Sequence, residues 1–284
     1  MQEQKTVLIT GGNDGIGKAT AAELSRSGMQ VILACRNEEK ARLTAREIQE
    51  QAGNGQVAVL PCDLGNMESI RGAARQFKEQ YGRLDVLINN AGVFTSQLEH
   101  TREGFELQFG VNHLGHFLLT HLLLERLQQA PGPRVINVSS IAYLQGQVDF
   151  DNLRGEKGAA RYNGLKAYAQ SKLANVLFTR ELARRYPQLG AYALHPGPVR
   201  TRIGNKHSTW YTSLGWQLLK VFMTSAEKGA KTSVYLATTP GLESARGQFF
   251  DDKQRQRSLS ATAKDEALAR KLWEVSEDMV GNRK

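Results

Sequence analysis

The sequence predicts an α/β protein: one doubly wound domain with a parallel, seven-stranded sheet and helices on both faces. Short apolar runs alternate with stretches of helical length, which is the pattern of strand–helix–strand units joined by right-handed crossovers. The composition agrees, because 40% of the 284 residues are hydrophobic and 23% are charged, as in soluble globular proteins. No repeat, low-complexity tract or linker interrupts the pattern, so we expect a single domain over residues 1–284.

Seven apolar runs predict the strands of the sheet. They are short and are bounded by glycine, proline or polar residues, as strands are. The runs lie at 5–10, 29–35, 56–60, 84–88, 134–138, 190–194 and 247–250.

Helical spacing fills the intervals between these strands. It predicts helices over 18–25, 38–51, 67–81 and 104–129, and a further helix that carries Tyr168 and continues through Phe178. Gly28 would cap the first helix, and the prolines at 131 and 133 stop the fourth.

Charge and cysteine content exclude several classes of protein. The formal net charge is +9, but basic residues are interspersed with acidic ones and no zinc spacing or aromatic–basic motif occurs, so we expect no nucleic-acid partner. Cys35 and Cys62 each close an apolar run, which predicts buried thiols in a reducing compartment.

The chain contains no apolar run of about eighteen residues and no signal-peptide pattern. We expect a cytoplasmic protein whose membrane contact is at most peripheral.

A glycine-rich loop joins the first strand to the first helix. Gly11-Gly-Asn-Asp-Gly-Ile-Gly17 would let the backbone approach a pyrophosphate, which helix N-terminal amides bind; a structural turn is the alternative. The second strand ends at Arg36, with no acid before Glu38. An arginine there favours the 2'-phosphate of NADP over the free ribose of NAD, although an ordinary surface arginine would look the same.

Polar residues also follow the later strands, whose carboxyl ends meet at the edge of the sheet where ligands bind. Asp63 would accept a hydrogen bond from an adenine amino group or, equally, cap a turn. The small residues in Asn89-Asn-Ala-Gly92 would let a ring lie against the backbone. A hydroxyl of Ser139 or Ser140 would point into the same cleft.

Tyr168 and Lys172 are four residues apart in a predicted helix, so their side chains share a face. A phenol has an ordinary pKa of about 10, and a neighbouring ammonium lowers that pKa. The pair would serve as a general acid and base; an ordinary half-exposed helix face is the alternative.

Histidines 113, 116 and 121 lack a carboxylate or cysteine to complete a metal site, and we expect no metal.

Together these motifs resemble the short-chain dehydrogenase/reductases, a family of Rossmann-fold oxidoreductases, in the family's order along the chain. They are Thr10–Gly17, Asn89–Gly92, Asn112, Ser140, Tyr168-Ala-Gln-Ser-Lys172 and Pro196-Gly197. Other segments are similar to the retinol dehydrogenase branch, to which protochlorophyllide reductases and WW-domain oxidoreductases are related. These segments are Cys35-Arg36, Val111–Thr120, Ser171–Asn175 and Leu272–Ser276. The similarity extends from about Lys5 to Val280.

The resemblance implies catalytic roles for Asn112, Ser140, Tyr168 and Lys172. Tyr168 would give a proton to the carbonyl oxygen during reduction, and Ser140 would hydrogen-bond that oxygen. Lys172 would lower the pKa of Tyr168 and bind the nicotinamide ribose. Asn112 would hold a water that connects Lys172 to solvent.

The same resemblance implies NADP(H) as cofactor, because a side chain cannot supply hydride. The pyrophosphate would lie on the glycine loop, and Val199 and Thr201 would lie beside the carboxamide. The expected contacts are Gly11, Asn13, Asp14, Gly15, Ile16, Arg36, Asp63, Leu64, Asn90, Ala91, Gly92, Tyr168, Lys172, Pro196, Gly197, Val199 and Thr201.

Two segments set the chain apart from most of the family. An insert at about 144–165 lengthens the interval between Ser140 and Tyr168; the retinol dehydrogenase branch shares it. The insert leaves the choice between Ser139 and Ser140 open, and we favour Ser140. A segment at about 202–225 occupies the family's substrate-lid position. Its apolar residues would line a pocket, although packing against the core or a membrane surface explains them as well.

We expect an NADP-dependent carbonyl reductase or alcohol dehydrogenase that acts on an apolar aldehyde or ketone, retinal-like or other. Retinol dehydrogenases usually carry an apolar N-terminal anchor that this chain does not show, which puts a retinoid substrate in doubt. The alternatives are an NADPH-dependent C=C reductase of the protochlorophyllide reductase type and a catalytically silent dinucleotide-binding regulator. Family members often pair through the helices that carry Asn112 and Tyr168, so we expect a homodimer or tetramer.

Overall fold

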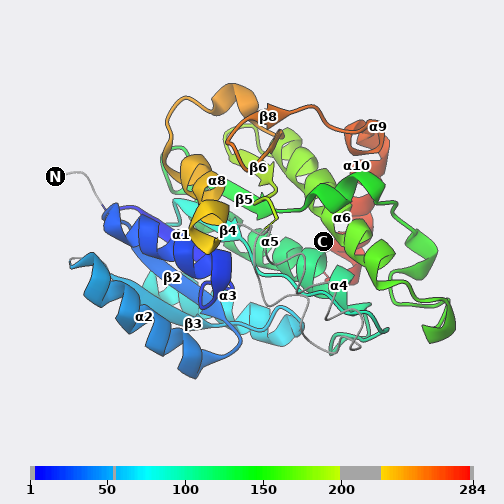
Figure 1. The fold of residues 1–284 in the computed structure, drawn as a ribbon, viewed down its shortest axis with the longest axis horizontal. Helices are drawn as coiled ribbons and strands as arrows, with labels where there is room; N and C mark the ends of the chain where they lie inside the picture. Colours follow the sequence, from blue (N-terminus) through cyan, green and yellow to red (C-terminus); the bar gives the residue numbers. More distant parts are fainter. Residues whose placement is uncertain (1–3, 54–55, 199–224, 282–284) are drawn as a thin grey trace.

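The computed structural model describes residues 4–53, 56–198 and 225–281 (Figure 1). Its eight named strands form one sheet in the order β3-β2-β1-β4-β5-β6-β7-β8. The order reverses between β1 and β4, which is where ligands bind in open α/β sheets. The strands are β1 (Thr6–Thr10), β2 (Gln30–Cys35), β3 (Val57–Pro61), β4 (Val86–Asn89), β5 (Arg134–Val138), β6 (Gly190–Leu194), β7 (Phe249–Phe250) and β8 (Gln256–Arg257).

The prediction of a doubly wound parallel sheet is confirmed for β1 to β7, and an eighth strand corrects the count. β8 pairs antiparallel with β7. Asp251 shapes the turn between them, because its Oδ1 accepts from the backbone amides of Lys253 and Arg255 at 2.9 and 3.0 Å. Both residues of β8 are exposed, so the sequence carries no apolar run that would reveal this strand.

Helices cover both faces of the sheet, as expected (Figure 1). Alternate side chains along a strand point to opposite faces; in β1, Val7 and Ile9 enter one buried cluster and Leu8 enters the other. The first cluster includes α1 (Gly15–Arg26), α2 (Glu38–Ala52) and α8 (Ala226–Thr238). The second includes α3 (Met67–Gln80), α5 (Gly115–Gln128), α6 (Gly164–Arg185) and α10 (Glu266–Met279).

The helix expected over 104–129 begins later and is interrupted. Gly104 has a φ of +78° and lies outside the helix, which starts with α4 (Leu107–Phe109). The Glu106 carboxylate caps it by accepting from the amides of Gln108 and Phe109, at 3.0 and 2.7 Å. A π-helical turn (Gly110–Leu114) then precedes α5. Such turns inside helices are frequent at functional sites, and this one contains Asn112.

The remaining named elements are short. They are the 3₁₀ turns Ile141–Gln145, Phe150–Asn152, Ala159–Arg161 and Glu243–Ala245, and α9 (Ala261–Lys264). Cys35 and Cys62 are buried free thiols, as predicted, and burial raises their pKa values to about 11 and about 12. No helix in the described ranges is long and apolar enough to cross a membrane.

The C-terminal helix α10 covers part of α5 and α6. The Trp273 ring is 2% exposed and packs on Phe117 of α5 and Phe178 of α6, with ring centroids 5.1 and 5.8 Å apart. His113 Nε2 lies 2.9 Å from Ser276 Oγ of the same helix. These contacts make α10 part of the main core of the domain.

Truncation of Trp273 tests the importance of this cover. We expect Trp273→Ala to lower the free energy of unfolding by about 3–5 kcal/mol, the usual cost of emptying a large aromatic core position. Urea denaturation followed by circular dichroism measures it. Trp273→Phe is the matched control: it keeps an aromatic ring and removes an indole N–H that has no hydrogen-bond partner among the described residues. An equal loss in both variants would contradict the packing argument.

Candidate active site

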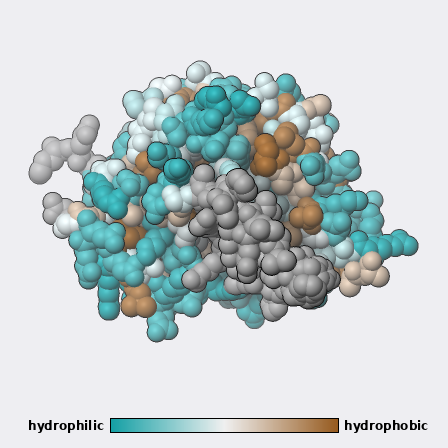
Figure 2. Space-filling model, in the orientation of Figure 1, coloured by the Kyte–Doolittle hydropathy of each residue, from teal (hydrophilic) through white to brown (hydrophobic). Residues whose placement is uncertain are grey.

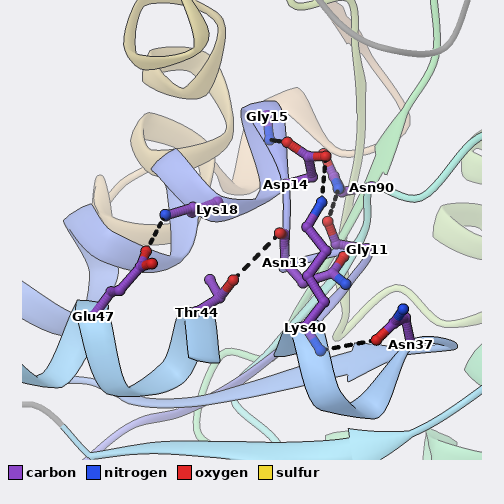
Figure 3. A network of polar contacts seen from close by, with 10 residues as sticks. All are labelled: Gly11, Asn13, Asp14, Gly15, Lys18, Asn37, Lys40, Thr44, Glu47 and Asn90. Atoms are coloured by element: carbon purple, nitrogen blue, oxygen red, sulfur yellow. Dashed lines mark hydrogen bonds and ion pairs between the residues drawn. The ribbon is translucent and has the colours of Figure 1, made fainter. Parts of the chain in front are cut away.

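The glycine loop packs directly against the turn that follows β4 (Figure 3). A Cβ placed on Gly17 would lie 2.4 Å from Gly11 O and 2.5 Å from Asn90 Nδ2, so no larger residue fits there. Asn90 Nδ2 donates to the carbonyls of Thr10 and Gly11, at 2.8 and 3.4 Å. Gly11 has a φ of +64°, which glycine adopts without strain. The loop is therefore held close to β4.

Asp14 occupies the N-terminus of α1, next to Gly15 and Ile16. Its Oδ1 accepts from the Gly15 amide at 2.8 Å, and its Oδ2 lies 2.5 Å from Lys40 Nζ (Figure 3). Lys40, in the first turn of α2, thus contacts the glycine loop, although the sequence pattern did not point to it. The ammonium offsets the Asp14 carboxylate at a helix end that favours anions.

Arg36 lies where the sequence predicted it, at the end of β2. It is exposed, and the chain there is tied to the glycine loop because Gly11 N donates to Ala34 O at 2.9 Å. The same loop contacts α2, since Thr44 Oγ1 donates to Asn13 O at 3.4 Å. The end of β2 and helix α2 therefore both lie next to the glycine loop.

Asp63 serves a turn after β3, which was one of its two expected roles. Its Oδ1 accepts from the Gly65 amide at 2.9 Å. Leu64 is buried, and a Cβ on Gly115 would lie 2.6 Å from Leu64 O. This loop therefore rests on the start of α5.

The turn after β4 connects the loop to the predicted catalytic residues. Thr10 Oγ1 accepts from the amides of Asn90 and Ala91, at 2.9 and 3.0 Å. A Cβ on Gly92 would lie 3.5 Å from Asn112 Oδ1 and 3.6 Å from Lys172 Nζ. The turn therefore contacts the loop through Thr10 and lies close to Asn112 and Lys172 at Gly92.

Asn112 joins three elements from the middle of the π turn, where it is fully buried. Its Oδ1 accepts from Val93 N at 2.7 Å, and its Nδ2 donates to Val93 O and to Ser171 Oγ, both at 3.0 Å. The side chain links the strand β4 loop to α6. Its expected role in holding a water remains a prediction.

Tyr168 and Lys172 lie on one face of α6, with Lys172 Nζ 5.5 Å from the centre of the Tyr168 ring. Lys172 is 4% exposed, and its ammonium donates to Val138 O at 3.1 Å. Burial lowers the Lys172 pKa to about 8. Burial also raises the pKa of Tyr168, and a hydrogen bond with Ser140 opposes that rise. The expected lowering of the Tyr168 pKa by Lys172 is not found, because the pKa is raised and only Ser140 opposes the rise.

The structure separates the two serines that the sequence left open. Ser139 is 2% exposed, and its Oγ donates to the backbone carbonyl of Lys172 at 2.7 Å. Ser140 instead contacts the Tyr168 hydroxyl, and its Oγ accepts from Ala142 N at 3.3 Å. Of the two serines, Ser140 is therefore the one next to the Tyr168 hydroxyl.

The turn after β6 has the backbone that its sequence implied. Gly197 has a φ of +79°, and its amide donates to His195 Nδ1 at 3.2 Å. Pro196 is partly buried beside it. Val199 and Thr201, and the expected lid up to residue 224, lie outside the described residues.

The insert forms a wall of a cleft of about 450 Å³ that is lined mostly by residues with polar side chains. Tyr162 anchors it: its hydroxyl donates to Glu106 Oε1 and accepts from Gln108 Nε2, both at 2.8 Å. Burial raises the pKa of Glu106. From α6, Lys166, Ala167 and Gln170 line the cleft, but Tyr168 and Lys172 do not, so the cleft lies apart from the face that carries this pair.

The histidines of the long helix are engaged in protein contacts. His113 and His116 are each 1% exposed, and burial lowers their pKa values to about 3 and about 4. His121 Nδ1 lies 3.0 Å from Phe117 O. Within the described ranges no three His, Cys, Asp or Glu residues gather as metal ligands would.

The chain is similar to known short chain dehydrogenases over most of its length. The family model of the short chain dehydrogenases matches residues 5–212. Human retinol dehydrogenase 11 is 48% identical, with 98% of this chain and 86% of the relative covered. Mouse retinol dehydrogenase 14 is 45% identical over the same shares.

Solved structures show the same fold. An uncharacterized protein from Mycobacterium Paratuberculosis is 37% identical, with a TM-score of 0.76 and coverage of 98% of this chain and 94% of that one. A short chain dehydrogenase from Shigella flexneri 2a, complexed with NADP, has a TM-score of 0.66 at 24% identity and covers 88% of this chain and 97% of that one. At that identity it supports the fold alone. The chain belongs to the short-chain dehydrogenase/reductase family of oxidoreductases and is a retinol dehydrogenase-like member of it.

Proposed function

We propose that this protein transfers hydride between NADPH and an apolar aldehyde or ketone, with Tyr168 as acid and base. The observation that carries the proposal is the convergence of three groups: the Ser140 hydroxyl contacts Tyr168, and buried Lys172 lies beside the Tyr168 ring and Gly92. When bound, the dinucleotide supplies the hydride that no side chain can provide.

The residues present fit such a dinucleotide. The glycine loop has no room for a Cβ at Gly17, and the N-terminus of α1 follows it directly. Backbone amides at a helix N-terminus favour phosphate, and Lys40 offsets the nearby Asp14 carboxylate. Arg36, exposed at the end of β2, supplies the positive charge that a 2'-phosphate needs, which supports NADP over NAD.

Proton transfer falls to this chain's own side chains. Tyr168 is protonated at neutral pH because burial raises its pKa, so its hydroxyl has a proton to donate to a carbonyl oxygen. Ser140 donates a second hydrogen bond to that oxygen, stabilising the charge that develops there. The Lys172 ammonium favours the phenolate that remains after the transfer.

Exposed apolar side chains that are close in sequence to Ser140 and Tyr168 support an apolar substrate. Four large hydrophobic residues are strongly exposed in the described part of the chain, and three of them flank the catalytic residues: Ile141 and Leu144 follow Ser140, and Leu165 precedes Tyr168 by one helical turn. Figure 2 shows that hydrophilic residues cover much of the face in view, with smaller hydrophobic patches between them. The names of the relatives, retinol dehydrogenases, point in the same direction.

We also propose a cytoplasmic, single-domain protein, with membrane contact at most peripheral; fractionation of cells that produce it tests the location.

A homo-oligomer would need a surface other than the part of α5 and α6 that α10 covers. Chemical cross-linking of the full chain tests this, and a cross-link between copies through Phe117 or Phe178 neighbours would contradict it.

Tyr168→Phe tests the proposed function. The substitution keeps the ring and removes the transferable proton, so we expect turnover to fall roughly 100- to 10,000-fold, the usual contribution of a general acid. NADPH binding, followed by fluorescence titration, should stay within a few-fold of the parent. The substrates are retinal, simple aldehydes and a conjugated C=C compound.

The parent protein decides between the alternatives in the same assay. Reduction of the C=C compound alone would replace the carbonyl assignment with that of a C=C reductase. Tight NADPH binding without turnover of any substrate would indicate the silent regulator, and Tyr168→Phe activity close to the parent would sink the assigned role.

Ser139 and Ser140 form a matched pair for a second test. We expect Ser140→Ala to lower kcat by roughly 100-fold or more, because a hydrogen bond to the developing oxyanion is lost. Ser139→Ala removes a bond to the Lys172 carbonyl instead and should cost about 1 kcal/mol of unfolding free energy with a much smaller loss of turnover. Steady-state kinetics and urea denaturation measure both. The reverse order of the two kcat losses would reassign the role to Ser139.

Arg36→Gln tests the choice of cofactor. A charge-assisted contact to a phosphate contributes about 1.5–3 kcal/mol, so we expect the NADPH dissociation constant to rise roughly tenfold to a hundredfold while that of NADH changes little. Arg42→Gln is the control, because Arg42 is an exposed arginine of the same helix region whose guanidinium pairs with Glu38. Equal affinity of the parent for NADH and NADPH would refute the role of Arg36.

A further inference from the structure

His116 connects the cofactor side of the site to the catalytic side. The residue lies in the second position of α5, 1% exposed, and both of its ring nitrogens are engaged. Nδ1 lies 3.0 Å from the backbone carbonyl oxygen of Asn112. Nε2 lies 2.8 Å from the hydroxyl oxygen of Thr10. The mechanism above uses neither contact.

The directions of these hydrogen bonds follow from counting donors and acceptors. The Asn112 carbonyl only accepts, so the proton of the ring is on Nδ1. A neutral imidazole has one N–H, and Nε2 therefore accepts from Thr10. The other two bonds of the Thr10 oxygen come from the amides of Asn90 and Ala91. The alternative acceptor for the Thr10 proton, Ile88 O, is more distant at 3.4 Å.

The neutral form of the ring is the one that its surroundings support. Burial lowers the His116 pKa to about 4, and the positive charge of Lys172 acts in the same direction. The hydrogen bond to Asn112 O opposes this only in part. At neutral pH a single chain of hydrogen bonds thus extends from the Asn90–Ala91 turn through Thr10 and His116 to Asn112.

We propose that His116 is a positioning residue, which fixes the Asn90–Ala91 turn and the backbone of Asn112 relative to each other. The inference rests on the proposed function, in which the Asn90–Ala91 turn binds the cofactor and Asn112 is one of the catalytic residues. The Asn112 carbonyl belongs to the π turn, and its bond to His116 keeps that turn in register with the loop. The two ring nitrogens therefore support different properties. The contact of Nε2 supports dinucleotide binding, and the contact of Nδ1 supports the rate of turnover.

Two substitutions separate the two halves. In His116→Asn the amide nitrogen occupies the place of Nδ1 and keeps the bond to Asn112 O, but nothing reaches Thr10. In His116→Gln the amide oxygen occupies the place of Nε2 and keeps the bond from Thr10, but Asn112 O loses its partner. His113→Asn is the control, since His113 is equally buried in the same helix stretch and contacts Ser276 of α10 instead.

Kinetics and NADPH titration read out the three variants. One net hydrogen bond corresponds to about a tenfold change. We expect His116→Asn to raise the NADPH dissociation constant about tenfold with kcat nearly kept, and His116→Gln to lower kcat about tenfold with NADPH affinity nearly kept. His113→Asn should lower stability and change neither. Equal losses of kcat and affinity in both His116 variants would show a merely structural role and overturn the inference.

A spectroscopic measurement tests the hydrogen-bond chain without any assay of activity. Nitrogen NMR of the protein with ¹⁵N-labelled histidine distinguishes the six residues, and the signal lost in His116→Asn identifies His116. We expect a neutral Nδ1–H tautomer between pH 6 and 8. An Nε2–H tautomer, or protonation within that range, would overturn the inference. If the parent binds NADPH but reduces nothing, the proposed function fails while the tautomer still decides this inference.

Discussion

The burial of the Lys172 ammonium is the constraint on which the site depends. The pKa falls from 10.5 to about 8, which corresponds to about 3 kcal/mol of unfavourable free energy for the charged form. Because the folded pKa lies below the unfolded one, the fold bears this full cost below about pH 8 and is relieved of it as the pH rises through 8 to 10.5. The charged form of Lys172 therefore lowers the stability of the fold at neutral pH.

The surrounding polar groups are arranged to make this burial tolerable. Val138 O accepts from both Lys172 Nζ and Asn175 Nδ2, at 3.1 and 3.4 Å, and Ser139 fixes the backbone of Lys172. Below them Asn89 Nδ2 donates to Asn137 Oδ1 at 2.8 Å across β4 and β5. Buried polar groups cost free energy unless they are paired, so this network limits which side chains the carboxyl ends of these strands accept.

The sequence was sufficient for features that depend on local pattern. Strands from β1 to β7 follow apolar runs, and the glycine loop follows from the spacing of residues that need small or flexible backbone positions. Gly17 shows why, since the space for its Cβ is already filled by Gly11 and Asn90. The pairing of Tyr168 with Lys172 needed only helical periodicity.

Features that depend on tertiary distance were out of reach of such patterns. Lys40 belongs to the loop side because its side chain reaches Asp14, 26 residues earlier. The π turn around Asn112 has no local signature in the residues that form it, and it was predicted as regular helix. The two adjacent serines differ only in which partner each meets, the Lys172 carbonyl or the Tyr168 hydroxyl.

The buried Lys172 ammonium also affects His116, which stays neutral at the pH at which Lys172 is charged. Both are basic groups in one buried region, and a second positive charge there would add repulsion to the cost of desolvation. His116 can give up its proton at a pKa of about 4, whereas Lys172 retains its own up to about pH 8. The imidazole is therefore free to act as a neutral group that donates on one side and accepts on the other. A lysine or arginine at 116 could not accept a hydrogen bond from the Thr10 hydroxyl, and it would bring a second positive charge close to Lys172. The charge of Lys172 therefore restricts which residue can connect Thr10 to Asn112.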